Sequence, residues 1–239
     1  MRASESLAVA LLAALPGWAA AQANQAAAPR VMAPVEQYRI ADPREEIALA
    51  RTAAPASLSA DATVLVLGKR GYETAVEGRN GFVCFVERSW TADFDAPVFW
   101  DPTIRAPNCF NPPAVHSVLP QFLARTQWAL AGMSRAEMLE KARAAFASHR
   151  FTPPDAGSLS FMLSKQGYLG KAAGGPWRPH VMFFVPRGHA PIWGAGRKDS
   201  PILGEDGGPF EPTVLFIPVP RWSDGSPATP PPREHQHGP

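Results

Sequence analysis

Five residues suited to ligand binding flank one strongly apolar segment of the chain, residues 181–185. They are Trp177, Arg178, His180, His189 and Trp193. An indole can stack on a sugar or aromatic ring, and a histidine exchanges a proton near neutral pH. The pattern therefore predicts a binding surface for a small or extended ligand. In the simpler alternative, the indoles cap a sheet and His180 bonds a loop carbonyl.

A second combination would support catalysis. His180 is a candidate general base of a hydrolase, with Lys165 or Glu87 as its partner. Co-location of these groups in one pocket would favour an enzyme. In the competing interpretation, Lys165 is solvated and Glu87 forms an exposed strand-end ion pair with Arg88, which contributes about 0–1 kcal/mol.

Standard catalytic and cofactor motifs are absent from the sequence. It contains no His-Glu-x-x-His helix, no Gly-x-Ser-x-Gly elbow, no P-loop and no Gly-x-Gly-x-x-Gly turn. The interval between His180 and His189 matches no recognised metal-ligand spacing. We therefore expect neither a metal site nor a cofactor, and the sequence leaves open whether the protein is an enzyme.

The two cysteines, Cys84 and Cys109, are predicted to form a disulfide. An even number of cysteines outside the cytoplasm favours pairing. Cys84 falls in a predicted strand and Cys109 in a proline-rich loop, so the bridge would tie a loop to a strand. Two buried thiols that never meet are the alternative, because the sequence does not give their Cα separation.

The N-terminal residues have the pattern of an export signal. An apolar run at 7–14 precedes Pro16-Gly17, and the triplet 21–23 has small residues at its first and third positions. The apolar run is shorter than the roughly 20 residues that span a bilayer. We expect a signal peptide at 1–23, a flexible leader at 24–41, and a periplasmic or secreted protein with no membrane span after cleavage.

Alternating and apolar patterns predict about six strands. They lie at 63–67, 72–77, 82–88, 159–164, 180–185 and 213–219. The Asn80-Gly81 pair is a hairpin signal, so the first three strands are expected to form an antiparallel meander. The long aromatic and acidic loop 89–113 is either folded over the core or functional.

Helix signals lie on both sides of this loop. Asp42-Pro43 predicts a short helix start. A helix is expected from Pro113 to about 131, with Pro120 as its kink or its true start. Ser134 and Glu137 form a capping box that opens a second helix. The prediction is an α+β fold at 42–222, a mostly antiparallel sheet with this helical hairpin on one face, followed by a disordered proline-rich tail at 223–239.

The composition restricts the classes of partner. A hydrophobic fraction of 46% is enough to build a core, and the formal net charge is only +2. A general nucleic-acid binder would show a concentrated basic face, so nucleic acid is not an expected partner.

Four stretches of the chain resemble a group of exported bacterial proteins to which no activity is assigned. They are residues 64–78, 82–90, 109–114 and 162–169. The resemblance covers most of 42–225 and implies export and a single domain. It transfers no catalytic residue to this chain.

Three functions are consistent with these features. The first is a non-catalytic exported domain that binds a small or extended ligand. The second is a periplasmic hydrolase that uses His180 with Lys165 or Glu87. The third is an envelope-associated structural protein whose tail contacts a partner in an extended conformation.

Overall fold

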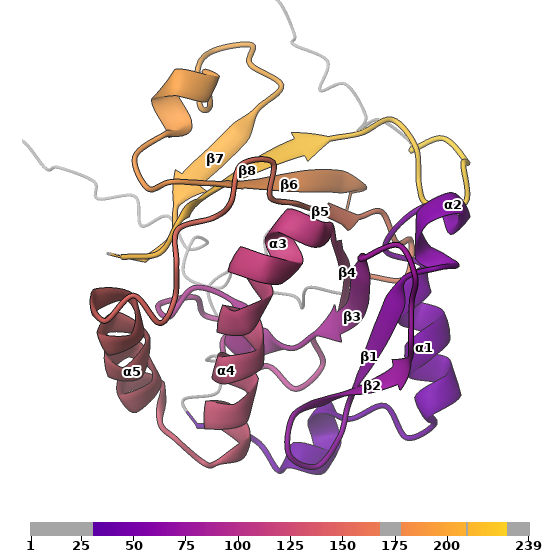
Figure 1. Cartoon of the computed structure of the whole chain (residues 1–239), viewed down its shortest axis with the longest axis vertical. Coiled ribbons are helices and arrows are strands. Elements are labelled where there is room, and N and C mark those ends of the chain that lie inside the picture. Colours follow the sequence, from indigo (N-terminus) through magenta and orange to yellow (C-terminus); the bar gives the residue numbers. More distant parts are fainter. Residues whose placement is uncertain (1–30, 168–177, 209, 229–239) are drawn as a thin grey trace, which may run out of the picture.

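One eight-stranded mixed sheet organises the molecule (Figure 1). The computed structural model describes residues 31–167, 178–208 and 210–228. The strands are β1 (Thr63–Leu67), β2 (Tyr72–Val76), β3 (Val83–Glu87), β4 (Ala106–Phe110), β5 (Leu159–Met162), β6 (His180–Val185), β7 (Leu203–Asp206) and β8 (Thr213–Pro218). Their order across the sheet is β2-β1-β3-β4-β5-β6-β8-β7. The α+β class is confirmed, but the prediction of about six strands missed β4 and β7.

The predicted antiparallel meander is wrong at its second connection. β1 pairs with β2 in antiparallel fashion, whereas β3 pairs with the other edge of β1 in parallel. Residues 78–81 therefore do not close a hairpin; they carry the chain across the start of β1. There the backbone of Gly78 packs against Thr63, and its N–H donates to Thr63 Oγ1 over 3.0 Å. A side chain at Gly78 would collide with the Thr63 backbone, so the crossing requires glycine.

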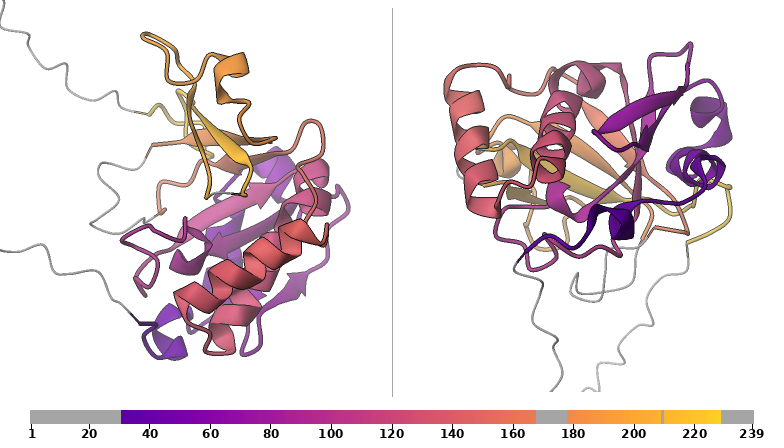
Figure 2. Two further views of the ribbon diagram at one scale, coloured as in Figure 1. Left: turned by 90° about the vertical axis from the view of Figure 1, so that its left-hand side faces the viewer. Right: turned by 90° about the horizontal axis from the view of Figure 1, so that it is seen from below.

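Helices cover the two faces of the sheet unequally. α1 (Pro43–Arg51) and the short α2 (Ala56–Ser59) belong to one side, where alanines of the α1 region pack against Cys84 and Val86. α3 (Pro112–Ser117) and α4 (Leu119–Leu130) cover the opposite face, where Phe85 and Phe110 lie. α5 (Arg135–Ala147) packs beside α4 (Figure 2). We call these the α1 face and the α4 face.

The helix starts follow the local sequence closely. Asp42 accepts a hydrogen bond from the N–H of Arg44 at the start of α1. Ser134 and Glu137 form the predicted capping box of α5. The long helix expected from Pro113 is interrupted between α3 and α4, with Pro120 in the first turn of α4. α4 and α5 follow each other in the chain and pack together, so the predicted helical hairpin is confirmed.

The disulfide between Cys84 and Cys109 is present, but it joins two strands. Cys109 lies in β4, where it is the direct antiparallel partner of Cys84 in β3. Both cysteines are fully buried beneath α1. The prediction of a loop at Cys109 failed because β4 contains Pro107, a residue that normally argues against a strand in a sheet interior.

Both expected flexible ends include folded residues. In the leader, η1 (Val35–Tyr38) buries Tyr38 completely, and its hydroxyl donates to the Trp100 carbonyl over 2.8 Å. In the tail, the N–H of Ser223 donates to the Leu163 carbonyl, and Asp224 pairs with Lys165. The predicted signal peptide, residues 1–23, and residues 229–239 of the predicted tail lie outside the described residues. No helix within the described ranges is long and apolar enough to cross a membrane.

Candidate functional site

Two consecutive charged residues at the end of β3, Glu87 and Arg88, point to opposite faces of the sheet. Successive side chains of a strand alternate between faces, so Glu87 follows Phe85 toward α4. Arg88, the next residue, points toward α1. The expected Glu87–Arg88 pair therefore does not form, and each residue has a separate set of partners.

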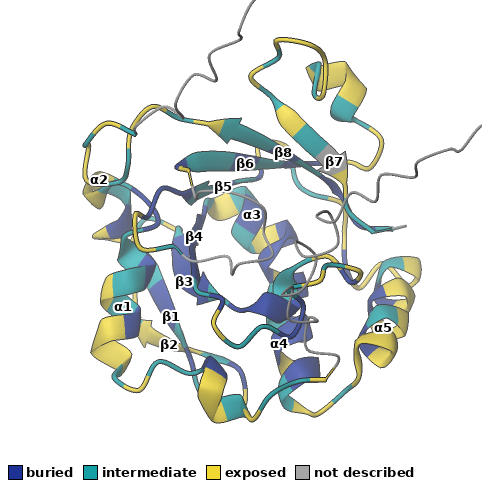
Figure 3. Ribbon diagram, turned by 180° about the vertical axis from the view of Figure 1, so that it is seen from behind, coloured by how far each residue is buried: buried dark blue, intermediate teal, exposed yellow. Residues whose placement is uncertain are grey.

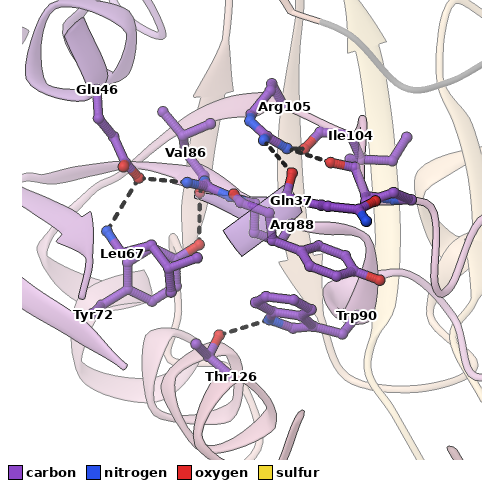
Figure 4. Close-up of polar contacts among 12 residues, drawn as sticks. Gln37, Glu46, Leu67, Tyr72, Val86, Arg88, Trp90, Ile104, Arg105 and Thr126 are labelled. Carbon is purple, nitrogen blue, oxygen red and sulfur yellow. Dashed lines mark hydrogen bonds and ion pairs between the residues drawn. The ribbon is translucent and has the colours of Figure 1, made fainter. Parts of the chain in front are cut away.

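Arg88 forms a sealed ion pair with Glu46 of α1 (Figure 4). The guanidinium lies 2.8 Å from Glu46 Oε1, and both side chains are at most 1% exposed. Arg88 also donates to the carbonyls of Tyr38 and Val86, and Glu46 accepts from the N–H of Leu67. These hydrogen bonds help the buried pair to offset the cost of desolvation. The pair is closed off from solvent. Its contacts link α1, β1 and β3.

Arg105 and Tyr72 border the same cluster (Figure 4). Arg105 donates to the carbonyls of Gln37, Pro102 and Ile104. Burial and the nearby Arg88 charge lower the pKa of Arg105 to about 10, so it remains a cation at neutral pH. Tyr72 donates to the Val86 carbonyl, and burial raises the pKa of its hydroxyl. Both residues act as hydrogen-bond donors within the fold.

Glu87 is the unusual group on the α4 face. Asn108 of β4 donates to Oε1, and Thr91 of η2 (Ser89–Thr91) donates to Oε2 over 3.0 Å. Burial raises the pKa of Glu87 from 4.5 to about 7, against the opposing effect of these hydrogen bonds. A carboxyl with that pKa exchanges its proton near physiological pH.

The side chain of Asn108 is placed to respond to a change of protonation at Glu87. Its side chain is fully buried, and its Oδ1 has no hydrogen-bond partner. Rotation of the amide would turn Oδ1 toward Glu87, where it can accept a hydrogen bond from the protonated, neutral acid. The pair can therefore satisfy either protonation state of Glu87.

A second buried ion pair, Arg125 with Glu211, lies on this same face. Arg125 of α4 is 3.1 Å from Glu211 Oε1 and donates to the carbonyls of Trp90 and Ala92. Its guanidinium stacks 4.2 Å from the centre of the Phe94 ring. Burial lowers the pKa of Arg125, and the charges of Glu211, Asp93 and Glu87 act against that shift. The Arg125 charge thus connects Glu87 electrostatically to Asp93.

A hollow of about 680 Å³ is lined in part by contacts of this pair, namely Phe94, on which Arg125 stacks, and Gly208, which is bonded to Glu211. Its walls come from the loop after β3, the first turns of α5 and the β7–β8 turn. The lining residues are Asp93, Phe94, Asp95, Arg135, Ala136, Leu139, Asp206, Gly207 and Gly208. Glu211 holds the third wall, because its Oε2 accepts from the Gly208 N–H over 2.8 Å. We call this space the acidic hollow.

Carboxylates dominate the charge of the acidic hollow. Asp206 accepts from Thr213 and from the Gly188 N–H, and these bonds keep its pKa below the ordinary value. Partial burial raises the pKa of Asp93, and Asp95 adds to the shift. Within the described ranges, no side chain or N–H donates a hydrogen bond to the carboxylates of Asp93 and Asp95. The hollow therefore presents solvent-facing carboxylates, free of protein donors within the described ranges, beside an apolar wall.

The structure does not bring the five predicted binding residues together. Arg178 and His180 lie at the start of β6, whereas His189 and Trp193 follow its end. Five residue steps of a strand span about 17 Å, so the entry and the exit of β6 cannot share one small-molecule site. Trp193 packs against Phe183, with ring centres 5.9 Å apart. The fifth residue, Trp177, lies outside the described residues.

The three proposed hydrolase residues also have separate contacts. His180 bonds the Arg178 carbonyl and packs on Phe216, and burial lowers its pKa. Lys165 pairs with Asp224 over 2.8 Å. Two strands separate β3 from β6, which puts Glu87 and His180 on strands about 14 Å apart. Across 31–167, 178–208 and 210–228, no hydrogen bond or ion pair joins these three residues.

Sequence reasoning singled out the loop of the acidic hollow and its Asp93, but not the residues that α5 and the β7–β8 turn contribute. The length and aromatic content of 89–113 marked it as functional or folded over the core, and the structure shows that part of it lines the hollow. Arg135 and Asp206 come from distant segments, and no local pattern joins them to Asp93. Only the folded arrangement of α5 and the β7–β8 turn could reveal them.

No family model, no curated protein and no solved structure matches this chain. Within the part of the chain that is described, no group of three or more His, Cys, Asp or Glu residues is placed to hold a metal ion.

Proposed function

We propose that this protein is an exported, non-catalytic domain that binds a small amine-bearing ligand in the acidic hollow. Export is supported by the N-terminal signal pattern and is compatible with the disulfide between Cys84 and Cys109. The binding site is supported by the geometry of the hollow.

The observation that carries this proposal is the state of Asp93. Its carboxylate is exposed to solvent in the hollow, lies near Asp95 and accepts no hydrogen bond from any group within the described ranges. A ligand ammonium group would donate hydrogen bonds to this carboxylate and add positive charge beside it, and charge-assisted hydrogen bonds are among the stronger ones. A cation is therefore the ligand chemistry that best fits this wall.

The remaining walls indicate the size and shape of the ligand. A hollow of about 680 Å³ lies within the range of small-molecule sites. Phe94 and Leu139 offer apolar surface to an alkyl chain. Arg135, whose guanidinium lies 5.9 Å from the Phe99 ring centre, can face an anionic group at the other end of the ligand. A flexible amine with an alkyl body matches these features.

A thermal-shift screen tests the proposal. The probes are putrescine, agmatine and lysine, with glucose and glutarate as neutral and anionic counterparts. Ligand binding to the native state raises the apparent melting temperature, so the amines should stabilise the protein and the counterparts should not. Stabilisation by glutarate alone, or by none of the amines, would contradict the proposed ligand class.

The matched pair of variants is Asp93→Asn and Glu77→Gln. Both remove one carboxylate from the surface, but Glu77 is exposed in the loop after β2, far in sequence from the walls of the hollow. Amine stabilisation should fall in Asp93→Asn and persist in Glu77→Gln. An equal loss in both variants would indicate nonspecific attraction of cations to an acidic surface.

A further inference from the structure

The region between β6 and β7 gathers most of the exposed apolar side chains. Four large hydrophobic residues are exposed within the described ranges, and three of them lie here: Ile192, Trp193 and Leu203. We call residues 186–203, which include η4 (Ala190–Trp193), the η4 arm. It projects beyond the sheet and away from α4 and α5 (Figure 2). Figure 3 shows that much of its surface is exposed, unlike the sheet beneath it.

Backbone hydrogen bonds between residues of the η4 arm define its conformation. The N–H of Ile192 donates to the His189 carbonyl, and the N–H of Ala195 donates to the Ala190 carbonyl. Gly194 has a φ of 70°, which allows the turn to end there. Trp193 is held by Phe183, while 42% of its surface is exposed. A tip with satisfied backbone groups can enter an apolar layer at low cost.

Two cations flank this tip. Arg197 and Lys198 are exposed on the arm, and within the described ranges neither forms an ion pair. Asp199 is the carboxylate on the arm, and Arg187 at its base is already engaged by Asp206 over 3.9 Å. The arm therefore combines a convex apolar tip with an excess of positive charge. A convex tip suits a soft, deformable surface better than a rigid protein pocket.

We propose that the η4 arm docks the protein on the surface of an anionic lipid bilayer. Ile192 and Trp193 enter at the headgroup level, where tryptophan is favoured, and Arg197 and Lys198 face lipid phosphates. This role is independent of the acidic hollow, since none of these four residues lines it. The two proposals can therefore fail separately.

Co-sedimentation with vesicles tests the docking. The vesicles are phosphatidylcholine alone and phosphatidylcholine with one third phosphatidylglycerol. The protein should sediment with the anionic vesicles, and raised salt should weaken this binding because surface charges are screened. Equal binding to both vesicle types, or none to either, would overturn the proposal.

Paired variants assign the binding to the arm. Ile192→Ser should weaken vesicle binding on the order of tenfold, whereas Val31→Ser, at an exposed apolar residue outside the arm, should not. Arg197→Gln with Lys198→Gln should weaken it about fivefold for each charge. Lys69→Gln with Arg70→Gln, in an exposed turn elsewhere, should leave it unchanged.

Further measurements separate docking from misfolding and from self-association. Each variant's urea midpoint should match that of the parent protein, since Ile192, Arg197 and Lys198 are exposed. Sedimentation velocity should give the same mass for the parent and for Ile192→Ser. A parent dimer that Ile192→Ser dissociates would identify the tip as an interface between two copies and would overturn the lipid assignment.

Discussion

The two faces of the sheet each bury an arginine–glutamate pair, and the pairs differ in what surrounds them. On the α1 face, Arg88 and Glu46 are buried and hydrogen-bonded to the backbone beside the disulfide-bonded strands. On the α4 face, Arg125 and Glu211 contact residues of a hollow in which two carboxylates, Asp93 and Asp95, accept no hydrogen bond from the described residues. The same chemical pair therefore stabilises the fold on one face and supports a candidate binding site on the other. Substitutions on the two faces should separate stability from binding.

Glu46→Gln on the α1 face should give the largest loss of stability. It leaves the Arg88 charge buried without a counter-charge, and breaking a buried pair in this way costs about 3–5 kcal/mol. Urea denaturation measures this loss, and amine binding by the folded fraction should be unchanged. A loss below about 1 kcal/mol would show that the pair is not sealed.

The double substitution Cys84→Ala with Cys109→Ala should give the next largest loss of stability. The two cysteines are 25 residues apart in sequence, and a crosslink of that length stabilises by about 3–4 kcal/mol in the chain-entropy model. Denaturation of the parent protein with and without reductant gives the same comparison. Amine binding again should not change, because the bridge lies on the α1 face.

Glu211→Gln on the α4 face should affect both properties. Loss of its charge leaves Arg125 without its ion-pair partner, at a cost of about 2–3 kcal/mol. The freed Arg125 charge would also neutralise more of Asp93, so amine affinity should fall. Calorimetry on the folded variant checks this second effect. An unchanged amine affinity would contradict the proposal that the pair on the α4 face supports ligand binding.

Glu87→Gln should change the pH dependence of stability. The folded-state pKa of Glu87, about 7, lies above its ordinary 4.5, so the folded protein retains a proton that the unfolded chain releases. This contribution is present below about pH 4.5, is lost as pH rises through 7, and stays lost above it. The variant should flatten that decline and be more stable at pH 8 by on the order of 2 kcal/mol. An unaltered pH dependence of stability would show that the Glu87 side chain is solvated and keeps its ordinary pKa.

Local signals in the sequence predicted local structure well. The capping box at Ser134 and the interruption near Pro120 are determined by residues within one or two helical turns, and both are confirmed. The cysteine pairing was predicted from the even number of cysteines and the expected export. These features need no knowledge of distant segments.

Long-range features were missed for a common reason. Glu46 and Arg88 are 42 residues apart, and the parallel pairing of β1 with β3 decides that they meet. Nothing in the Gly78–Gly81 segment distinguishes a crossing from a hairpin, because both need glycine. The acidic hollow likewise combines Asp93, Arg135 and Asp206 from three separate segments.

Asp93→Asn should have the smallest effect on stability and the most direct effect on function. The side chain is at the surface, so unfolding should change by less than about 0.5 kcal/mol. Isothermal titration of agmatine into the parent, Asp93→Asn and Glu77→Gln proteins tests the central claim. The account predicts saturable one-site binding that weakens about tenfold in Asp93→Asn and is retained in Glu77→Gln. Binding that is absent from the parent, or equal in all three proteins, would contradict a ligand site in the acidic hollow.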